Sequence, residues 1–527
     1  MSPNIFGFAA EPHSPSLQDL EQIQGQIRDN QFVPALAALA RLIARDMRNA
    51  QLWLLTGLAY TRMASWKPAI SALETALQLD PQEIQAKYLL ALALFSVGRV
   101  SEACDLIDKV ARKGSVGPHW MMRAYIHAHT SRDPMVALAV ARDWGKRFAD
   151  PLTRQARPLV VRDREPRKRL KVGYVSADLR EHSVAFFIEP MLAHHNPERV
   201  EVHIYSNGPV DDITVQLQSL VAHWRDVQAL TDEELHAKIR EDGIDVLVDL
   251  SGYTNGHRLG VFARRAAPVQ VTWLGYKLTL GMKAMDYRLF DATAPRVQQF
   301  YSEKLFPLKC PTSYTPPAYA PICEEPPAAR NGYVTFVSLN NSAKITAEVL
   351  ELWAEILGKV ENSLLLVYVK EENLDAAQSH MMPRVQSAGL PLDRVLVIAH
   401  QPLSNFMETG FIADIVLDTF PICGGTTTLH SIWMGMPVVA MLGKRDVENS
   451  SAKAIWGLGM GGRIAKTKQE YVRHAVGLAN DVAFLRQCRA TYRQGLIDSS
   501  LMNYRARVHE VEDAYQQMWM EYLKKNN

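Results

Sequence analysis

Residues 417–435 contain the segment whose residue types are best suited to bind a charged ligand. A mostly apolar run at residues 412–417, typical of a buried parallel strand, is followed by Gly424, Gly425, Thr426, Thr427 and Thr428. A helix pattern then runs to Gly435. Glycine lets the backbone approach a phosphate, and helix N–H groups and threonine hydroxyls can donate hydrogen bonds to it. The segment predicts an anion-binding turn at the carboxyl end of a strand, where open α/β sheets bind ligands. An ordinary helix start without a ligand is the alternative.

The elements that must position this turn alternate between strand and helix. Strand patterns occupy residues 170–176, 200–206, 244–250 and 269–276 in a first group, and 333–339, 364–369, 395–398, 412–417 and 438–441 in a second. Helix patterns lie between them, for example at residues 232–242. Such alternation predicts two parallel, doubly wound sheets, and the proline-rich residues 311–327 separate them. Two Rossmann-like halves with a cleft between them form the GT-B glycosyltransferase layout.

The first 150 residues have a different, helical and repetitive pattern. Alanine recurs at intervals of 34 residues, at positions 35, 69, 103 and 137, each near the start of a predicted helix. The second unit is the clearest, with Trp53, Gly57 and Tyr60 in one helix and Ala69, Ala72 and Ala76 in the next. This spacing resembles the tetratricopeptide repeat, whose stacked helix pairs form a solenoid with a concave peptide-binding surface. An irregular helical bundle is the alternative.

These patterns together predict four parts and an α plus α/β fold class. They are a helical repeat domain over residues 1–150, a linker over 151–170, an N-terminal Rossmann-like half over 171–325 and a C-terminal half over 326–527. The linker contains three prolines and seven Lys and Arg residues, and we interpret it as solvated rather than as a site for an acidic partner. The C-terminal helix pattern, with Tyr515, Met518, Trp519 and Tyr522, is interpreted as structural, as a helix that packs across the domains.

Composition narrows the classes of partner. The net charge of +2 gives no electrostatic case for nucleic acid or a membrane surface, and no run of 18 apolar residues predicts a membrane span. The start of the chain lacks the basic and apolar pattern of a signal peptide. The five cysteines are scattered without metal-ligand spacing, which favours reduced thiols and a cytoplasmic location. The sequence patterns do not indicate which oligomeric state the protein adopts.

Seven ordered motifs carry a family resemblance. They are GYVS at 173–176, HSV at 182–184, RAAPVQVTWLGY at 265–276, MDYR at 285–288, YSE at 301–303, NNSAKI at 340–345 and LDTFP at 417–421, followed by the Gly-Thr turn. Together they resemble the O-GlcNAc transferase family, and their wording is most similar to the SPINDLY branch, whose plant members are protein O-fucosyltransferases. The resemblance covers about residues 170–525, with the helical repeats in the expected place before it.

The resemblance implies roles for individual residues. His182 matches a family histidine near sugar and acceptor, where an imidazole can accept a proton or orient the acceptor hydroxyl. Lys344 matches the lysine that contacts the donor diphosphate and would stabilise the leaving group. The implied donor-binding residues are Asn341, Lys344, Leu274, Gly275, Cys423, Gly425, Thr426, Thr427, Thr428 and His430. Asp242 and Asp245 are weaker candidates, because each could equally end a helix or begin a strand. No DxD metal motif is present, so we expect inverting, metal-independent chemistry with a nucleotide-sugar co-substrate and no other cofactor.

Three positions depart from the family pattern. Lys277 stands where relatives have proline, Phe406 aligns with a histidine associated with the base, and His430 aligns with an acidic residue that holds the ribose. These departures bear on donor identity and on the strength of the activity. We expect a protein O-glycosyltransferase that uses GDP-fucose or UDP-GlcNAc and modifies Ser or Thr of a protein docked by the repeats. The alternative is a repeat-based scaffold with a degenerate transferase domain. A transferase acting on a small molecule or polysaccharide is disfavoured, because it would leave the repeats without a purpose.

Overall fold

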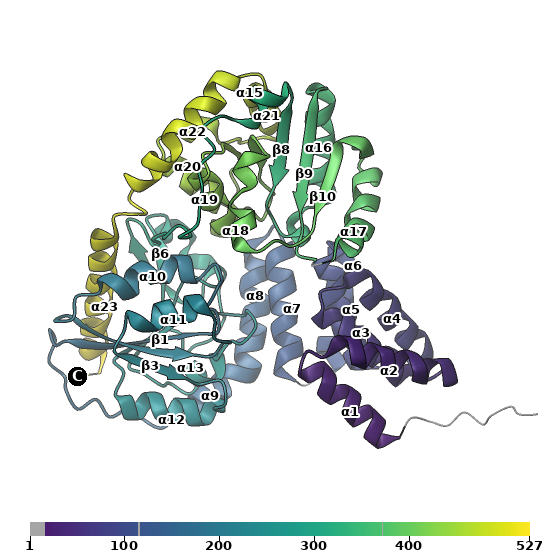
Figure 1. The fold of residues 1–527 in the computed structure, drawn as a ribbon. Coiled ribbons are helices and arrows are strands. Elements are labelled where there is room, and N and C mark those ends of the chain that lie inside the picture. The colour runs from purple at the N-terminus through teal and green to yellow at the C-terminus, as the bar shows by residue number, and fades with distance from the viewer. Residues whose placement is uncertain (1–15, 114–115, 372, 527) are drawn as a thin grey trace, which may run out of the picture.

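The computed structural model describes residues 16–113, 116–371 and 373–526. Figure 1 shows three parts: a helical array formed by the first helices of the described chain, a lower α/β half beside it and an upper α/β half above both. The last helices of the array lie between the two α/β halves and the earlier helices. This arrangement places the repeats against both Rossmann-like halves predicted from the sequence.

The helical array consists of antiparallel pairs stacked in sequence. Its helices are α1 (Leu17–Arg28), α2 (Phe32–Arg45), α3 (Ala50–Arg62), α4 (Trp66–Leu79), α5 (Ile84–Ser96), α6 (Val100–Lys113), α7 (Gly117–Thr130) and α8 (Pro134–Trp144). The periodic alanines lie in the first turns of α2, α4, α6 and α8 and are buried. A Cβ added at Gly57 would lie 2.5 Å from the Leu73 side chain. Small residues therefore set the close packing of the pairs, as the repeat pattern predicts.

The first α/β half contains a seven-stranded parallel sheet with strand order β3-β2-β1-β4-β5-β6-β7. The strands are β1 (Leu170–Ser176), β2 (Val200–Ser206), β3 (His223–Asp226), β4 (Val246–Asp249), β5 (Val269–Thr272), β6 (Tyr287–Asp291) and β7 (Lys304–Leu308). Its helices are α10 (Ala185–His194), α11 (Asp212–Ser219), α12 (Asp232–Asp242), α13 (Leu259–Ala263) and α14 (Ala294–Val297), with the 3-10 turn η2 (Gln298–Phe300). β1 and β4 are buried throughout their centres, because helices cover both faces of the sheet.

The second half contains a five-stranded parallel sheet with strand order β10-β9-β8-β11-β12. The strands are β8 (Val334–Ser338), β9 (Ser363–Tyr368), β10 (Val395–Ile398), β11 (Ile415–Leu417) and β12 (Val438–Val439). The helices are α15 (Pro327–Asn331), α16 (Ala347–Lys359), α17 (Leu374–Ser387), α18 (Leu403–Phe406), α19 (Thr426–Trp433), α20 (Ser450–Gly457), α21 (Lys468–Ala479) and α22 (Val482–Ile497). Short 3-10 turns are η3 (Ser342–Lys344), η4 (Leu392–Arg394), η5 (Thr409–Phe411), η6 (Asp446–Glu448) and η7 (Gly461–Arg463).

The junction between repeats and first half differs from the predicted linker. Helix α8 continues through a π-helical turn (Gly145–Ala149) into α9 (Asp150–Gln155), so helix extends past residue 150. The apolar faces of α7 and α8 share one buried core with the first half, in which Trp144 packs against Tyr253. A Cβ at Gly145 would lie 2.2 Å from the carbonyl oxygen of Gly281, so the two backbones touch. The last repeat is thus joined to the first half by packing, and only residues 156–169 are extended linker.

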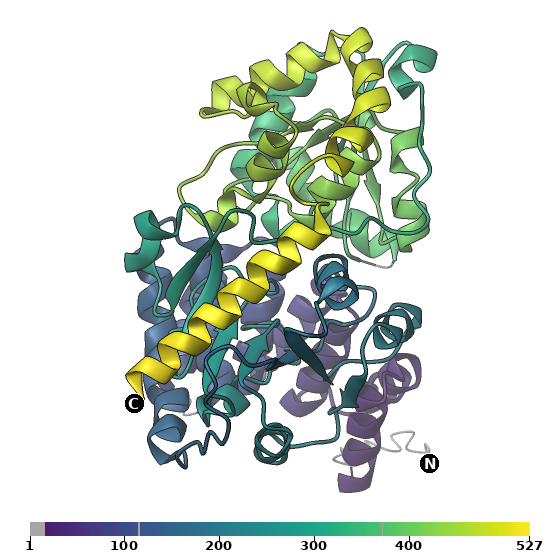
Figure 2. The same cartoon turned by 90° about the vertical axis from the view of Figure 1, so that its left-hand side faces the viewer.

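The C-terminal helix α23 (Tyr504–Lys525) also crosses a predicted boundary. Figure 2 shows it running from the upper half diagonally across the lower one. Its apolar face, which includes Val511, Tyr515 and Trp519, is buried in the core of the first sheet. The predicted range 326–527 for the C-terminal half is therefore too long, because burial of this face places the last helix on the first half.

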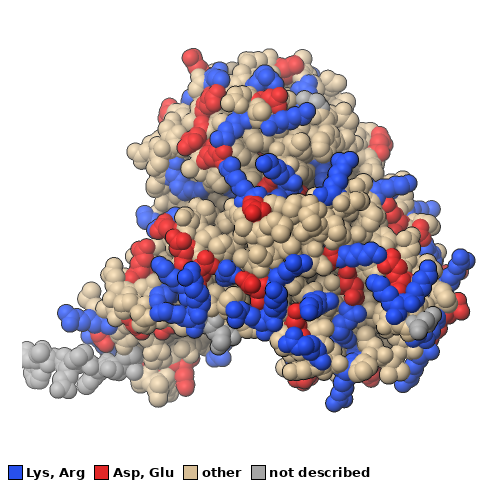
Figure 3. Space-filling model, turned by 180° about the vertical axis from the view of Figure 1, so that it is seen from behind, with Lys and Arg blue, Asp and Glu red and all other residues tan. Residues whose placement is uncertain are grey.

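Surface character agrees with the small net charge. On the face shown in Figure 3, acidic and basic side chains are mixed rather than gathered into one basic surface. None of the helices within residues 16–113, 116–371 and 373–526 combines the length and apolar character needed to cross a membrane.

Candidate active site

The Gly-Thr turn is held by a buried carboxylate at the end of β11. Asp418 Oδ1 accepts hydrogen bonds from Gly424 N (2.8 Å), Thr419 N (2.9 Å) and Asn340 Nδ2 (2.9 Å). A Cβ at Gly424 would lie 2.5 Å from the Thr428 hydroxyl and 3.1 Å from Asp418 Oδ1, so only glycine fits there. The carboxylate thereby fixes the backbone that enters α19.

Helix α19 begins at Thr426, directly after this turn. Gly425 occupies the N-cap position, and no side chain of the described residues caps the helix. Its first N–H groups and positive dipole end are therefore available to an anion. Thr426 and Thr427 line the adjacent cavity. Thr428 has a structural contact instead, since its hydroxyl lies 2.7 Å from Ser451 Oγ.

Lys344 approaches the same turn from the other side. Its Nζ donates to the carbonyl of Cys423 (2.8 Å) and more weakly to Asn340 Oδ1 (3.4 Å). Burial lowers the pKa of Lys344, while Cys423 and Asp418 oppose that shift. Asn341 caps the 3-10 turn before the lysine by accepting from Ala343 N at 3.1 Å. The ammonium is thus positioned beside the α19 N-terminus before any ligand binds.

His182 lies in the loop between β1 and α10. Its Nδ1 accepts a hydrogen bond from Val184 N at 3.3 Å and lies 3.7 Å from Asp178 Oδ1. Burial lowers the pKa of His182, Asp178 opposes that shift, and the cations Arg180 and Lys370 add to it. A neutral imidazole whose Nδ1 accepts carries its proton on Nε2, so this arrangement suits donation of a hydrogen bond from Nε2.

The segment after β5 forms the opposite wall. Leu274 has a positive φ of 60°, and a Cβ at Gly275 would lie 2.0 Å from the carbonyl oxygen of Leu250. This close approach requires glycine and turns the chain back over the sheet end. Lys277 follows, exposed, and its Nζ contacts Ser450 Oγ of the second half. The departure from the family pattern at Lys277 thus adds a second cation facing Lys344.

These elements surround a cavity of about 640 Å³ between the two halves and the repeats. A cavity of this size is in the range of small-molecule sites. The predicted residues that line it are His182, Leu274, Gly275, Asn341, Lys344, Cys423, Gly425, Thr426 and Thr427. Burial raises the pKa of the Cys423 thiol, which favours the protonated form. The structure therefore brings together nine side chains or backbone positions that lie far apart in the sequence.

Two predicted nucleotide contacts lie elsewhere. His430 is buried, and its Nδ1 lies 2.7 Å from Tyr314 Oη. Phe406 packs edge-on to His430, with ring centroids 6.0 Å apart. Burial lowers the pKa of His430 to about 3, so the ring is neutral. Neither residue is among the described residues that line the cavity. His430 faces Tyr314 because its position on α19 points into the aromatic core of the second half.

The repeats contribute cavity residues that the sequence did not indicate. Tyr125, His129 and Arg132, on α7 and just after it, line the cavity beside Tyr276. His129 Nδ1 lies 2.7 Å from the carbonyl oxygen of Tyr125, which can only accept, so Nδ1 carries the proton. Burial lowers the pKa of His129 to about 4, which leaves its Nε2 as an acceptor at neutral pH. These residues line the cavity because α7 packs against the first half, and no local sequence motif indicates that position.

The two weaker candidates are structural. Asp242 binds Arg225 (Nη2 to Oδ1, 2.7 Å) and accepts from Tyr205 Oη (2.8 Å). Asp245 pairs with Lys168 at 2.7 Å and joins the extended linker to the first sheet. Both lie on the first half away from the cavity-lining residues.

The chain has two α/β halves, each with a parallel sheet, and a cleft between them in which an uncapped helix faces a lysine. These features define a GT-B protein suited to a nucleotide-sugar. The family model "Glycosyl transferase family 41" matches residues 103–313 and 328–511. The chain belongs to glycosyl transferase family 41, which confirms the family predicted from the motifs. A model for subunit 3 of the anaphase-promoting complex matches residues 28–110, within the helical repeats.

Several relatives show how far the similarity extends. The solved structure of a mutant O-GlcNAc transferase from Thermobaculum terrenum is 31% identical, has a TM-score of 0.86 and aligns with 97% of this chain and 100% of its own. A protein from Hordeum vulgare described as "Probable UDP-N-acetylglucosamine--peptide N-acetylglucosaminyltransferase SPINDLY" is 38% identical over 396 residues. That match covers 72% of this chain and 41% of the Hordeum protein. The Arabidopsis thaliana SPINDLY protein is also 38% identical, over 398 residues that are 73% of this chain and 43% of that protein. The chain thus spans about two fifths of the curated relatives it matches.

Proposed function

We propose that this protein transfers a sugar from a nucleotide-sugar donor to a Ser or Thr hydroxyl of a protein acceptor. One observation carries the proposal: Lys344 and the uncapped N-terminus of α19 lie together in a cavity large enough for a small ligand. The hydroxyl oxygen would bond to the anomeric carbon as the bond from that carbon to the diphosphate breaks, and the hydroxyl proton would pass to the departing diphosphate or to water. Negative charge then grows on the diphosphate, where a fixed ammonium and helix N–H groups stabilise it.

The acceptor would enter from the repeat side of the cavity. Tyr125, His129 and Arg132 form that wall, and His182 lies on the first half. The contact between Val184 N and His182 Nδ1 supports a role for His182 in orienting the acceptor or sugar through Nε2–H. His129 presents the complementary acceptor atom, Nε2, and its low pKa makes it a hydrogen-bond acceptor rather than a strong base. The concave surface of the repeats would dock the rest of the protein acceptor.

Two donors fit the proposal. The SPINDLY-like motifs favour GDP-fucose, whereas the names of the relatives give UDP-N-acetylglucosamine. Phosphate contacts from Lys344, Lys277, Thr426 and Thr427 would be common to both, because they do not read the base. The reaction would proceed without a metal ion, since the diphosphate charge is met by two lysines and a helix end.

A thermal-shift panel tests the proposal on the full chain. GDP, UDP and CMP, each with its sugar conjugate, are added separately in EDTA, because a ligand that binds the folded state raises its melting temperature. Stabilisation by GDP and GDP-fucose alone selects the first donor, and stabilisation by UDP and UDP-GlcNAc alone selects the second. Transfer to peptide libraries then follows with the selected donor. A folded sample that responds to none of these ligands would refute the transferase and favour the scaffold alternative.

A further inference from the structure

Three metal-ligating side chains share one face at the edge of the first sheet. Glu201 and His203 are separated by two positions on β2, so both project from the same face of the strand. His203 lies directly opposite His223 on the edge strand β3 in the parallel register. Strand alternation and register therefore bring the three side chains together, although Glu201 and His223 are 22 positions apart in the sequence.

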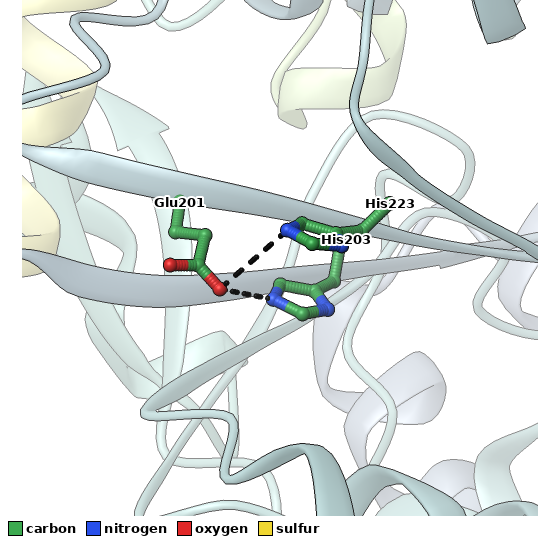
Figure 4. Close-up of side chains that lie close together, drawn as sticks. All are labelled: Glu201, His203 and His223. Atoms are coloured by element: carbon green, nitrogen blue, oxygen red, sulfur yellow. Dashed lines mark hydrogen bonds and ion pairs between the residues drawn. The ribbon is translucent and has the colours of Figure 1, made fainter.

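The ligand atoms are already close to one another. His203 Nε2 lies 2.9 Å and His223 Nε2 lies 3.7 Å from the same oxygen, Glu201 Oε1. Figure 4 shows both imidazoles turned toward that oxygen, and the rings are stacked 4.4 Å apart at an angle of 9°. Two ligands bound at about 2.1 Å in a tetrahedral zinc site are about 3.4 Å apart. The observed separations bracket that value.

We propose that Glu201, His203 and His223 bind a divalent transition-metal ion of the Zn²⁺ type, with water completing its coordination. Two imidazoles and one carboxylate are a donor set that suits zinc and its neighbours in the transition series. Within the described residues, this is the one group of three His, Cys, Asp or Glu side chains with ligand atoms all within 4.8 Å. The His223 side chain is 47% exposed, which gives the ion a route from solvent and leaves room for water.

The two nitrogens of the His203 ring have different surroundings. Nε2 lies 2.9 Å from Glu201 Oε1, and because a carboxylate oxygen only accepts, Nε2 donates in this structure. His203 Nδ1 is buried and has no hydrogen-bond partner among the described residues. Nδ1 can therefore take the ring proton when a metal ion displaces it from Nε2.

Two cations beside Glu201 modulate the site in opposite ways. Arg169 Nη1 lies 3.3 Å from Oε2, the oxygen that the histidines do not face, and orients the carboxylate. Lys171, directly across from Glu201 on β1, places Nζ 3.7 Å from Oε1, the oxygen that would ligate the metal. An ammonium there repels a dication, so Lys171 weakens binding. Removal of the Lys171 charge should therefore tighten it.

The site would act on the sheet rather than on sugar transfer. Glu201 is near the amino end of β2, whereas His182 follows the carboxyl end of β1. The two residues therefore lie at opposite ends of the parallel strands. Strand β3 is short and lies at the sheet edge. A metal held by β2 and β3 together would join this edge strand to the sheet and stabilise it against local opening.

Zinc titration of the full-length, EDTA-treated and desalted protein tests the proposal. Isothermal calorimetry with Zn²⁺ should show a site that His223→Ala weakens by about tenfold or more, as a lost ligand costs at least what a lost second-shell partner does. Lys171→Met should tighten the same site. His509→Ala is the matched control, because His509 is also exposed and also paired with a carboxylate, on α23. It should leave the Zn²⁺ affinity unchanged.

A spectroscopic readout makes the assignment specific. Co²⁺ in place of Zn²⁺ should give visible d–d absorption in the wild type and in His509→Ala, and lose it in His223→Ala. Zn²⁺ should also raise the melting temperature of the wild type but not that of His223→Ala. Equal Zn²⁺ affinity in the wild type and His223→Ala, or no binding to the folded wild type, would overturn the proposal. His223 is exposed on an edge strand, so circular dichroism should show that its alanine variant is folded.

Discussion

Replacement of Lys344 by methionine separates charge from packing at the proposed leaving-group site. Methionine keeps most of the side-chain length but removes the ammonium that lies 2.8 Å from the Cys423 carbonyl. Two unit charges about 4 Å apart at a partly buried site interact by about 4 kcal/mol, and only the charge that develops during bond breaking contributes to the rate. Loss of one preorganised donor typically lowers kcat by about 100-fold or more, which is about 2.7 kcal/mol. We expect that fall for Lys344→Met.

Steady-state kinetics with the donor selected by the thermal-shift panel measure this effect. The donor KM should change less than kcat, because the contact strengthens as charge grows on the leaving group. Lys359→Met is the matched control, since Lys359 is exposed on α16 in the same half and pairs with Glu355. Its kcat should stay at the wild-type value. A Lys344→Met variant that is folded and retains wild-type kcat would refute the assignment of Lys344 to the leaving group.

Three further predictions concern the cavity residues Lys277 and His182 and the repeat helices α7 and α8. Lys277→Ala removes the cation that contacts Ser450 across the cavity, and should raise the donor KM by about tenfold with a smaller effect on kcat, as a charge-assisted contact to a bound phosphate is lost; an unchanged KM would exclude that contact. Because burial lowers the pKa of His182 below its ordinary value of 6.5, activity should be level from that value to about pH 8 and fall only below it, and a fall that begins above pH 7 would contradict a neutral His182. Deletion of residues 1–115 should leave a folded protein, whereas deletion of 1–150 should aggregate because it uncovers the core that Trp144 fills; equal melting temperatures for the two truncations would show that α7 and α8 add no stability.

Much of the fold could be predicted from local sequence patterns. The 34-residue alanine period located α2, α4, α6 and α8, and apolar runs located β1, β2 and β10 at their observed bounds. Strand β3 (His223–Asp226) was missed because three of its four residues are polar and none of the four is fully buried. An edge strand of that kind has no hydrophobic pattern and exists because β2 offers it a partner. The sequence indicates that the C-terminal helix packs across the domains, as α23 does, but an amphipathic pattern does not identify which core the helix covers.

Site residues could be predicted where a local motif determines the backbone conformation. They could not be predicted where tertiary packing determines the direction of the side chain. Gly424, Gly425 and Thr426 follow from the requirements of a strand-to-helix turn, and the family motifs led to Lys344 and His182. His430 and Phe406 align with nucleotide contacts, yet a buried contact with Tyr314 holds His430 inside the second half. His129 was missed for the converse reason, because only the tertiary contact of α7 with the first half carries it to the cavity. An alignment shows which position of the chain corresponds to a family contact. The direction of the side chain at that position depends on the residues packed around it.

The two passages of the chain between the halves have a mechanical consequence. The first passage is residues 309–326 and the second is residues 498–503, and they are bonded to each other: Tyr314 N donates to Leu501 O (3.2 Å), and Tyr504 Oη donates to Tyr314 O (2.9 Å). Two covalent connections pinned side by side form a hinge line, which permits rotation of one half against the other but opposes sliding. The cavity wall that moves furthest is then the one opposite the hinge. Contacts between the repeats and the second half would have to break on opening: the ion pair of Arg132 with Glu348, and the hydrogen bonds from Arg445 to the Ala128 carbonyl and from Lys67 to Ser379. Because one partner of each contact belongs to the repeats, a protein bound to the repeats would act directly on the opening of the cleft.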